Sequence, residues 1–598
     1  NLYPQGPLDV SRTIALSFSM MSNESGVYGS GWRMSNTEFD IARSRLTLLT
    51  GEQFKTQSLP AVGGTLLFKD RKLADLVVKR PDTHTLHVIY KDGTVEVLQR
   101  TSSTSPYRIV ALQFENGERM KWEYAAGGSL ERILDHDQQV LLLLTYSSGR
   151  LVRADTRVDG GRHARVLFSQ TNGRLTGFSA PYDSRELPPS MGYVLEYGRA
   201  FRNGMIAIHR VRSPMSGDEL INYAENGHQY ANGQYIPRVT SWDQTPGAYQ
   251  PGMSRTYSYS PRRNFTGFPF SGGFREGEDN LYLVGSDYDY WTEETRIDSA
   301  AHNAVLSVTR TTFINYHLLA LELVRREGTM DSTQIEYNLR HGLFADQPPN
   351  FQLPRRITKS YALVAGGTAR QEVVTIETDS FGNELSRSEA TGVSTEYDYY
   401  PVGGEQGRCP ADPRGLFQRY LKQERVITAD GTPGVRVTDF TFTSLPAPAG
   451  GYFVLELSSI QAGRASVHKT YYDAPANLAL HGRLRTDTST LEGLALITEL
   501  SYIQSGDTLS ETRRLRGREG HWLDSLNVVS LTNRRLLSMN GDGETTLATT
   551  YDVAGRLTSE TASPGKPEEA ESRFVYHYAT PTTRAHLVTT DARGRSPV

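Results

Sequence analysis

The chain has 598 residues, of which 37% are hydrophobic and 22% are charged, and this ordinary globular composition excludes wholesale disorder. Its net charge of −3 provides no global field that would hold nucleic acid or an anionic membrane. The single cysteine excludes an internal disulfide framework and any thiolate-rich metal site.

The hydrophobic pattern along the chain has a period of two, which is typical of β-strands. Residues 86–90 and 94–98 are β-branched and aromatic runs joined by a short Asp-Gly turn, which predicts a hairpin. Residues 109–114 and 120–124 repeat this arrangement around Asn116-Gly117, a pair that suits the positive φ angles of a type I′ turn. Further strands are predicted at residues 166–170, 193–197, 373–377 and 574–578. We therefore predict an all-β chain, built as a long antiparallel array of hairpins.

Departures from this pattern are few. Residues 318–325 and 413–423 could each form a couple of helical turns, although neither has a cap at both ends. Gly- and Pro-rich segments at 241–277, 345–354 and 444–451 are predicted to be insertions in the array rather than linkers, because the same pattern resumes after each. No run approaches the roughly 18–20 apolar residues that span a bilayer. The sequence begins at Asn1 without a leader and stops at Val598, so we expect both ends to be cuts through a longer polypeptide.

Short degenerate repeats recur along the array. Gly-Arg-Leu occurs four times, starting at residues 149, 173, 482 and 555, and Tyr-Asp recurs at, among other positions, 397, 472 and 551. We expect the tyrosine to end a strand, the aspartate to cap the turn and the glycine to supply a positive φ, after which arginine and leucine restart a strand. The residues assigned to such turns are Tyr397, Asp398, Tyr472, Asp473, Gly482, Arg483, Leu484, Tyr551, Asp552, Gly555, Arg556 and Leu557.

This strand-Tyr-Asp-x-x-Gly-Arg-Leu-strand pattern resembles the RHS or YD-repeat family. Residues 29–32 and 46–55 look like the entry segment of bacterial RHS polymorphic toxins, and residues 312–319 and 351–354 strengthen the match. The family includes the cocoon components of Tc insecticidal toxins, effectors of type VI secretion that act in interbacterial competition, and animal teneurins. The resemblance covers most of the chain, with irregular repeats between about residues 180 and 350.

The resemblance implies a hollow shell, or part of one, made by a spiralling β-sheet around a C-terminal toxin domain. It implies an RHS entry segment at 1–130, irregular RHS-like repeats with insertions at 131–370, and YD/RHS repeats at 371–598 that continue beyond the C-terminus. It also implies secretion or export from a bacterium, with the chain's own toxin domain as enclosed cargo and possible contact with a secretion apparatus or a Tc-type component. The family's self-cleaving core and the toxin are absent from the sequence, so no residue is assigned to self-cleavage. We expect no catalytic residue, cofactor, metal or nucleic-acid partner.

Several clusters of residues could in principle carry chemistry. Asp135-His136-Asp137 could orient an imidazole, but a polar turn before Val140 is the favoured interpretation. The acidic residues Glu276, Glu278, Asp279, Asp287 and Asp289 could supply oxygen ligands for calcium or a glycosidase carboxylate pair. The segment 540–544 is a weaker calcium candidate that fits a hairpin turn better.

A carbohydrate or cell-surface binding module is the alternative function, and a carbohydrate-active enzyme a less favoured one. The candidate residues of the binding module are the aromatics Tyr282, Tyr288, Tyr290 and Trp291, although most aromatic side chains in β proteins are buried by packing on the sheet. Cys409 is a lone thiol for which a structural role is favoured over nucleophilic catalysis.

Overall fold

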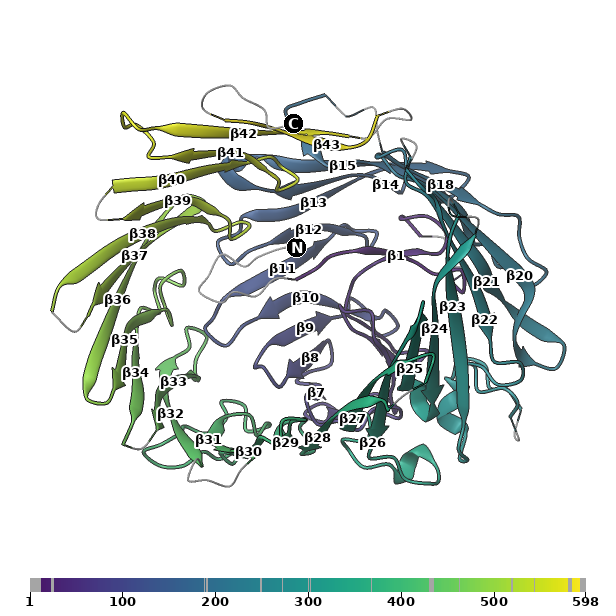
Figure 1. The fold of residues 1–598 in the computed structure, drawn as a ribbon, viewed down its shortest axis with the longest axis horizontal. Coiled ribbons are helices and arrows are strands. Elements are labelled where there is room, and N and C mark those ends of the chain that lie inside the picture. Colours follow the sequence, from purple (N-terminus) through teal and green to yellow (C-terminus); the bar gives the residue numbers. More distant parts are fainter. Residues whose placement is uncertain are drawn as a thin grey trace.

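A computed structural model describes residues 12–22, 26–187, 189, 192–247, 250–270, 273–299, 301, 303–366, 368–429, 435–461, 463–517, 520–541, 544–578 and 583–591. Strands β3 to β43 of these residues join one continuous antiparallel sheet, which confirms the predicted all-β array. β1 (Leu16–Phe18) and β2 (Trp32–Met34) form a separate two-stranded sheet. Figure 1 shows β8–β13 across the middle of the molecule and β18–β40 around its periphery.

The sheet begins with a small closed ring of eight strands. Successive pairings run from β3 to β10, β10 pairs back onto β3, and the bridge between Thr56 and Phe68 joins β5 to β6. Alternate apolar side chains fill the ring, and Phe39, Leu86 and Tyr107 are at most 1% exposed. The strands are β3 (Glu38–Asp40), β4 (Arg45–Thr47), β5 (Gln53–Lys55), β6 (Thr65–Leu66), β7 (Leu76–Lys79), β8 (Thr85–Tyr90), β9 (Val95–Gln99) and β10 (Tyr107–Gln113).

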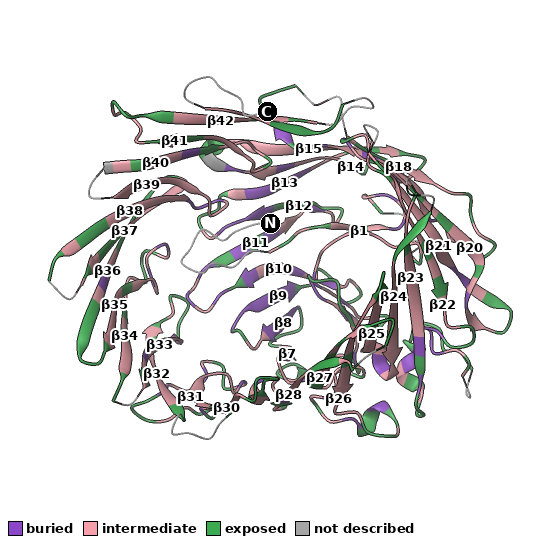
Figure 2. Ribbon diagram, in the orientation of Figure 1, coloured by how far each residue is buried: buried purple, intermediate pink, exposed green. Residues whose placement is uncertain are grey.

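The next strands carry the largest apolar core of the chain. Trp122, Ile133 and Leu151 are almost fully buried there, and the β1–β2 sheet packs against them through Leu16 and Met34. Figure 2 accordingly shows buried residues concentrated in the central strands. These strands are β11 (Arg119–Tyr124), β12 (Leu130–Leu134), β13 (Val140–Ser147), β14 (Arg150–Arg157), β15 (His163–Thr171), β16 (Arg174–Ser179) and β17 (Tyr182–Asp183), with a short 3-10 turn, η1 (Asp159–Gly161).

The remaining strands form a curved peripheral wall. Its first half consists of β18 (Gly192–Tyr197), β19 (Ile208–Arg212), β20 (Asp218–Ala231), β21 (Gln234–Thr245), β22 (Met253–Tyr259), β23 (Asp289–Asp298), β24 (Ala304–Ile314), β25 (Leu318–Arg326), β26 (Thr329–Tyr337) and β27 (Pro354–Leu363), with 3-10 turns η2 (Asn280–Leu283), η3 (Asn315–His317) and η4 (Phe344–Asp346). Its second half consists of β28 (Arg370–Thr378), β29 (Glu384–Ser388), β30 (Ser394–Tyr399), β31 (Leu421–Ile427), β32 (Arg436–Pro446), β33 (Tyr452–Gln461), β34 (Ala465–Tyr471), β35 (Leu484–Leu491), β36 (Leu494–Ser505), β37 (Thr508–Arg516), β38 (Trp522–Ser530), β39 (Leu536–Gly541), β40 (Glu544–Tyr551), β41 (Leu557–Ala562), β42 (Ala570–His577) and β43 (His586–Thr590).

The sheet is a spiral, because its later strands return to touch its earlier ones. We call β7–β15 the first pass and β28–β43 the second pass, and the line where they meet the seam. Lys91 Nζ donates to the carbonyl oxygen of Phe381 (2.9 Å), and Arg162 donates to that of Tyr551 (3.1 Å). These contacts join residues 290 and 389 positions apart. A Cβ at Gly117 would lie 2.8 Å from Pro448 Cδ, so the two passes approach closely at a turn where φ is +94°.

Alternate turns of the second pass reach the seam, since antiparallel strands place successive turns at opposite edges of the sheet. We call these turns, such as 379–383, 447–451 and 506–507, the docked ends. The intervening turns, such as 389–393 and 492–493, lie at the opposite edge, which we call the free rim.

The structure corrects both helix predictions. Residues 318–325 lie in strand β25, and residues 413–420 form a loop before β31. For residues 318–325, pairing with the two neighbouring strands of the sheet outweighs local helix propensity. The proposed divisions at 130/131 and 370/371 stay predictions, and the sheet crosses both within β12 and β28.

Candidate functional site

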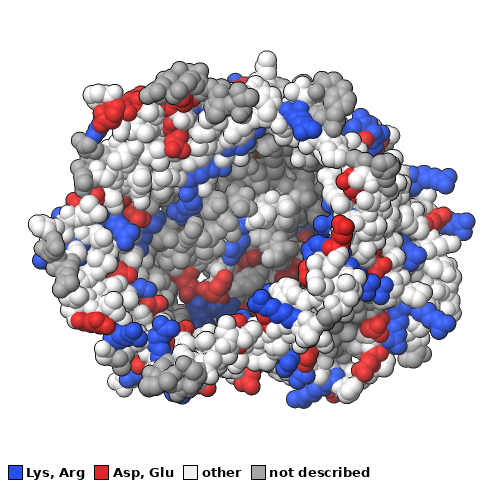
Figure 3. Space-filling model, in the orientation of Figure 1, with Lys and Arg blue, Asp and Glu red and all other residues white. Residues whose placement is uncertain are grey.

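The most prominent feature is a hollow. The face shown in Figure 3 is deeply hollowed at its centre, with basic and acidic side chains around the opening. The solvent-accessible surface is 31222 Å². A compact protein of 66.6 kDa would expose about 21,000 Å². The excess of roughly a half is what a wall with two uncovered faces requires.

The second pass is a single layer. In β36, Thr498 is the only described residue that is buried, and in β37 Leu509 is the only one. In β8, by contrast, four of six residues are buried. Because strand side chains alternate between faces, exposure on successive residues means that neither face of this wall is covered.

A buried ion-pair network fastens the seam. Arg419, from the loop before β31, donates to Glu115 of the first pass (2.5 Å) and to Asp412 of its own loop (2.9 Å). The Asp412 side chain is 1% exposed and that of Arg419 is 10% exposed. Phe417 of the same loop packs on Val95 and Val97. Burial raises the pKa of the Glu115 carboxyl, and Arg419 opposes that shift.

The same hydrogen-bond pattern, made by an aspartate carboxylate, stabilises several of the turns. The carboxylates of Asp135, Asp379 and Asp412 each accept from the backbone N–H groups two and four residues later. This confirms that residues 135–137 form a polar turn. Among the ion pairs of the described residues, His136 takes part in one, with the neighbouring Asp137 at 3.4 Å.

The repeat residues occupy three different settings. Tyr551 ends β40, and Asp552 accepts from Arg556 through both backbone and guanidinium, as expected for a turn cap. The four Gly-Arg-Leu glycines have φ between 72° and 89°, and a strand begins at the arginine or leucine that follows each.

Two Tyr-Asp pairs differ from that pattern. Tyr397 and Asp398 lie inside β30, where Asp398 pairs with Gln423, so this pair makes no turn. Tyr472 and Asp473 follow the end of β34, but Tyr472 pairs with Gly482 and Arg483 across a nine-residue excursion, and Asp473 is half exposed.

The acidic stretch and the segment around residue 316 come together. His317 bonds Asp279 through Nε2 (2.8 Å) and the Tyr290 hydroxyl through Nδ1 (3.0 Å), which links η2, η3 and β23. Tyr316 and His317 have φ of 64° and 63°, a region that costs energy for residues other than glycine. Since both imidazole nitrogens are engaged, this arrangement fastens three segments and leaves no nitrogen for a substrate.

The other carboxylates of the stretch pair separately. Asp287 faces His341 (3.1 Å) and Asp289 faces Arg263 (2.8 Å). No group of three potential metal ligands occurs among the residues that the structure describes. Of the segment 540–544, residues 541 and 544 pair as a hairpin, and 542–543 lie outside the described residues. Glu276 and Glu278 lie in the loop before η2, where Arg275 is 3.9 Å from Glu278.

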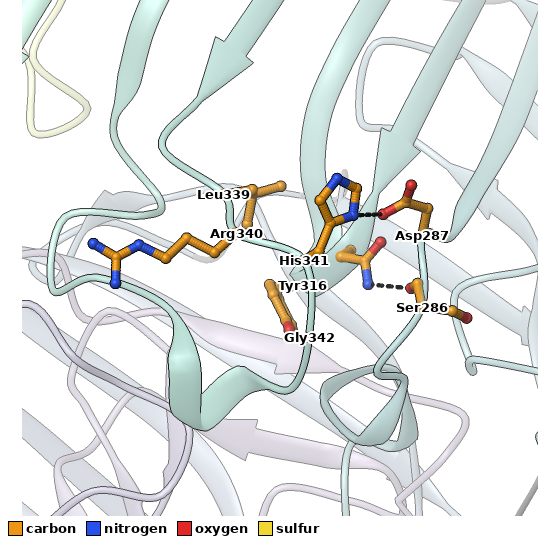
Figure 4. A pocket seen from close by; sticks show the side chains of 8 residues that line it. Ser286, Asp287, Tyr316, Leu339, Arg340, His341 and Gly342 are labelled. Atoms are coloured by element: carbon orange, nitrogen blue, oxygen red, sulfur yellow. Dashed lines mark hydrogen bonds and ion pairs between the residues drawn. The ribbon is translucent and has the colours of Figure 1, made fainter.

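A cavity of about 80 Å³ opens beside this cluster. Figure 4 shows Asp287 and His341, two of its lining residues, in contact with each other, and the Arg340 side chain directed away from them. Both ionic partners are more than 80% exposed, so the cavity is a shallow surface recess.

The predicted aromatic platform is not an exposed surface. Tyr288 and Tyr290 are 5% and 7% exposed in a core cluster, and Tyr282 packs against Tyr316 and Phe344. The Trp291 ring is covered by the Arg310 guanidinium at 4.3 Å. Cys409 is buried, and burial raises its pKa to about 12, so the thiol stays protonated at neutral pH.

The sequence did not single out Glu115, Arg419, His317 or Asp279 as interacting residues. Their partners are up to 304 positions away, and one chain read alone carries no signal of that pairing. The aspartate caps were detectable, because their partners lie within four residues.

Comparisons with known proteins give a limited result. No family model matches the chain, and no curated protein does. Crystal structures of TcdB2-TccC3-Cdc42 and TcdB2-TccC3-TEV are each 11% identical over 92% and 91% of this chain, with TM-scores of 0.36 and 0.34. A structure of TcdB2-TccC3 is 10% identical over 92% of this chain, with a TM-score of 0.21. The chain spans only 27%, 26% and 30% of those chains, and scores at this level assign neither family nor function. None of the described residues forms a helix long and apolar enough to cross a membrane.

Proposed function

We propose that this chain is a non-catalytic segment of a β-shell that encloses a polypeptide cargo. The observation that carries the proposal is the single-layered wall, which surrounds a hollow and exposes about half as much surface again as a compact protein would. A folded chain rarely leaves both faces of a long sheet uncovered unless something occupies one of them.

The enclosed cargo is a toxin domain that follows this segment in a longer, exported bacterial polypeptide. The resemblance of the Tyr-Asp and Gly-Arg-Leu turns to RHS repeats supports this choice. Charges of both signs around the hollow suit a cargo that must later leave, since a uniformly apolar lining would retain it. A secretion apparatus or a Tc-type component would then deliver the filled shell.

A carbohydrate-binding role has less support, because Tyr288 and Tyr290 are buried and Trp291 is covered. Catalysis is not part of the proposal. Both nitrogens of His317 are engaged, and the Cys409 thiol is buried, so neither offers a reactive group.

The test is to image the chain by single-particle electron microscopy, alone and with a protease-sensitive polypeptide fused after Val598. Extra density inside the hollow, with cleavage of the fused polypeptide slowed at least tenfold relative to the free polypeptide, is the expected result. A fused polypeptide that lies outside the wall and is cleaved as fast as the free one would refute enclosure. Mixing the same polypeptide with the chain, without fusion, controls for non-specific protection.

A further inference from the structure

Exposed apolar side chains gather along the free rim of the wall. Twelve large hydrophobic residues within about four positions of a free-rim turn are between 40% and 64% exposed: Val305, Leu306, Tyr361, Leu363, Val364, Val435, Ile460, Leu491, Leu494, Leu496, Leu523 and Met539. Along the opposite edge of β24–β43, the described large hydrophobic residues that are at least 40% exposed are fewer: Leu343, Leu385, Ile503, Val575 and Leu587. Figure 2 shows exposed segments at the tips of β35 and β38. Scattered apolar residues need no explanation, but an alignment along one edge does.

The molecule already shows how such an edge is covered. The first-pass turns at 91–94, 114–118 and 157–162 lie on the same edge of the continuous sheet as the free rim. At the seam they are buried against a second row of turns, through contacts such as Phe417 on Val97 and Arg419 on Glu115. The free rim is therefore the uncovered continuation of an edge that forms an interface elsewhere in the same chain.

A second copy of the chain can cover this edge with its own free rim. The opposite edge of the wall is already occupied, by the seam and by contacts with the small ring, where Lys55 bonds Gly277 and Lys72 bonds Gln347. The row of turns that another copy can offer is thus its own free rim. Two identical patches that meet in this way form an isologous, twofold interface.

We propose that the free rim is a docking surface for the free rim of a second copy, so that two hollow walls meet mouth to mouth. The inference rests on the proposed function and adds how the hollow is closed. Arg370 with Glu372 and Arg514 with Asp524 are neutral pairs at the rim, and such pairs add no like-charge repulsion between two rims. Half-burying these side chains on both rims removes on the order of 1,000 Å² of apolar surface, which reaches the size of a specific interface.

The test is sedimentation velocity of the purified chain over a hundredfold range of concentration, with two variants of strand β36. Leu491→Glu with Leu494→Glu places carboxylates on the free rim. Ile503→Glu places one near the docked end of the same strand, at a side chain that is 68% exposed. We expect the wild-type chain and Ile503→Glu to dimerise, and the rim variant to dissociate with a constant raised about a hundredfold or more.

A wild-type chain that stays monomeric throughout overturns the proposal, as does a dimer that the rim variant leaves unchanged. Circular dichroism checks that the variants fold, and Leu363→Glu with Val364→Glu is a second rim variant if the first does not. Electron microscopy must also show the two hollows facing each other, and a dimer joined elsewhere contradicts the inference. A monomer that still protects a fused polypeptide would overturn rim docking alone and leave enclosure standing.

Discussion

At the scale of a single residue, burial gives His228 a measurable pH signature. Its ring lies edge-on to Tyr259 (4.8 Å) and Phe265 (5.2 Å), and burial, followed by the nearby Arg238, lowers its pKa to about 4. The unfolded imidazole titrates near 6.5, so between pH 6.5 and 4 the unfolded state binds more protons and stability falls as the pH falls. Between pH 7 and about pH 4, the free energy of unfolding should fall by up to about 3 kcal/mol less in His228→Phe than in the wild type, as measured by urea unfolding. The exposed His84→Gln is the control, and an unchanged pH dependence in His228→Phe would contradict the assignment.

At the scale of the element, two aspartates that follow a tyrosine in the sequence have different structural roles. Asp552 accepts two bonds from Arg556 in the turn after β40, whereas Asp398 of another Tyr-Asp pair lies exposed within β30. Asp552→Ala should cost about 1 kcal/mol and speed hydrogen exchange at the β40–β41 turn, because it leaves a backbone donor without its partner. Asp398→Ala is the matched control and should change stability by less than about 0.5 kcal/mol. Equal losses of unfolding free energy in both variants would contradict the role of Asp552 as a turn cap.

These turns also show why part of the structure was predictable. The hairpins at 85–99 and 107–124 are specified by alternating residues and by turns such as Asn116-Gly117, so both strands and turn could be predicted locally. Residues 318–325 were misassigned because Leu and Glu favour a helix locally, while pairing with β24 and β26 makes them a strand. The Asp279–His317 and Glu115–Arg419 contacts depend on how far the sheet curves before it returns, and local patterns do not contain that curvature.

At the scale of the whole molecule, the seam joins the second pass of the sheet to the first, so that the row of hairpins closes on itself. Arg419 lies buried at the seam between Glu115 and Asp412, and removing it would leave two buried carboxylates without the cation that bonds them. Arg419→Ala should therefore destabilise the chain by about 3–5 kcal/mol. The exposed Arg370, paired with Glu372, is the control, and Arg370→Ala should cost less than about 1 kcal/mol. Small-angle scattering gives the structural readout. A compact protein of this length has a radius of gyration of about 25 Å, so the wild type should exceed that value and Arg419→Ala should exceed the wild type as the seam opens. A radius unchanged by Arg419→Ala would show that the apolar contacts of Phe417 hold the two passes together without the ion pair.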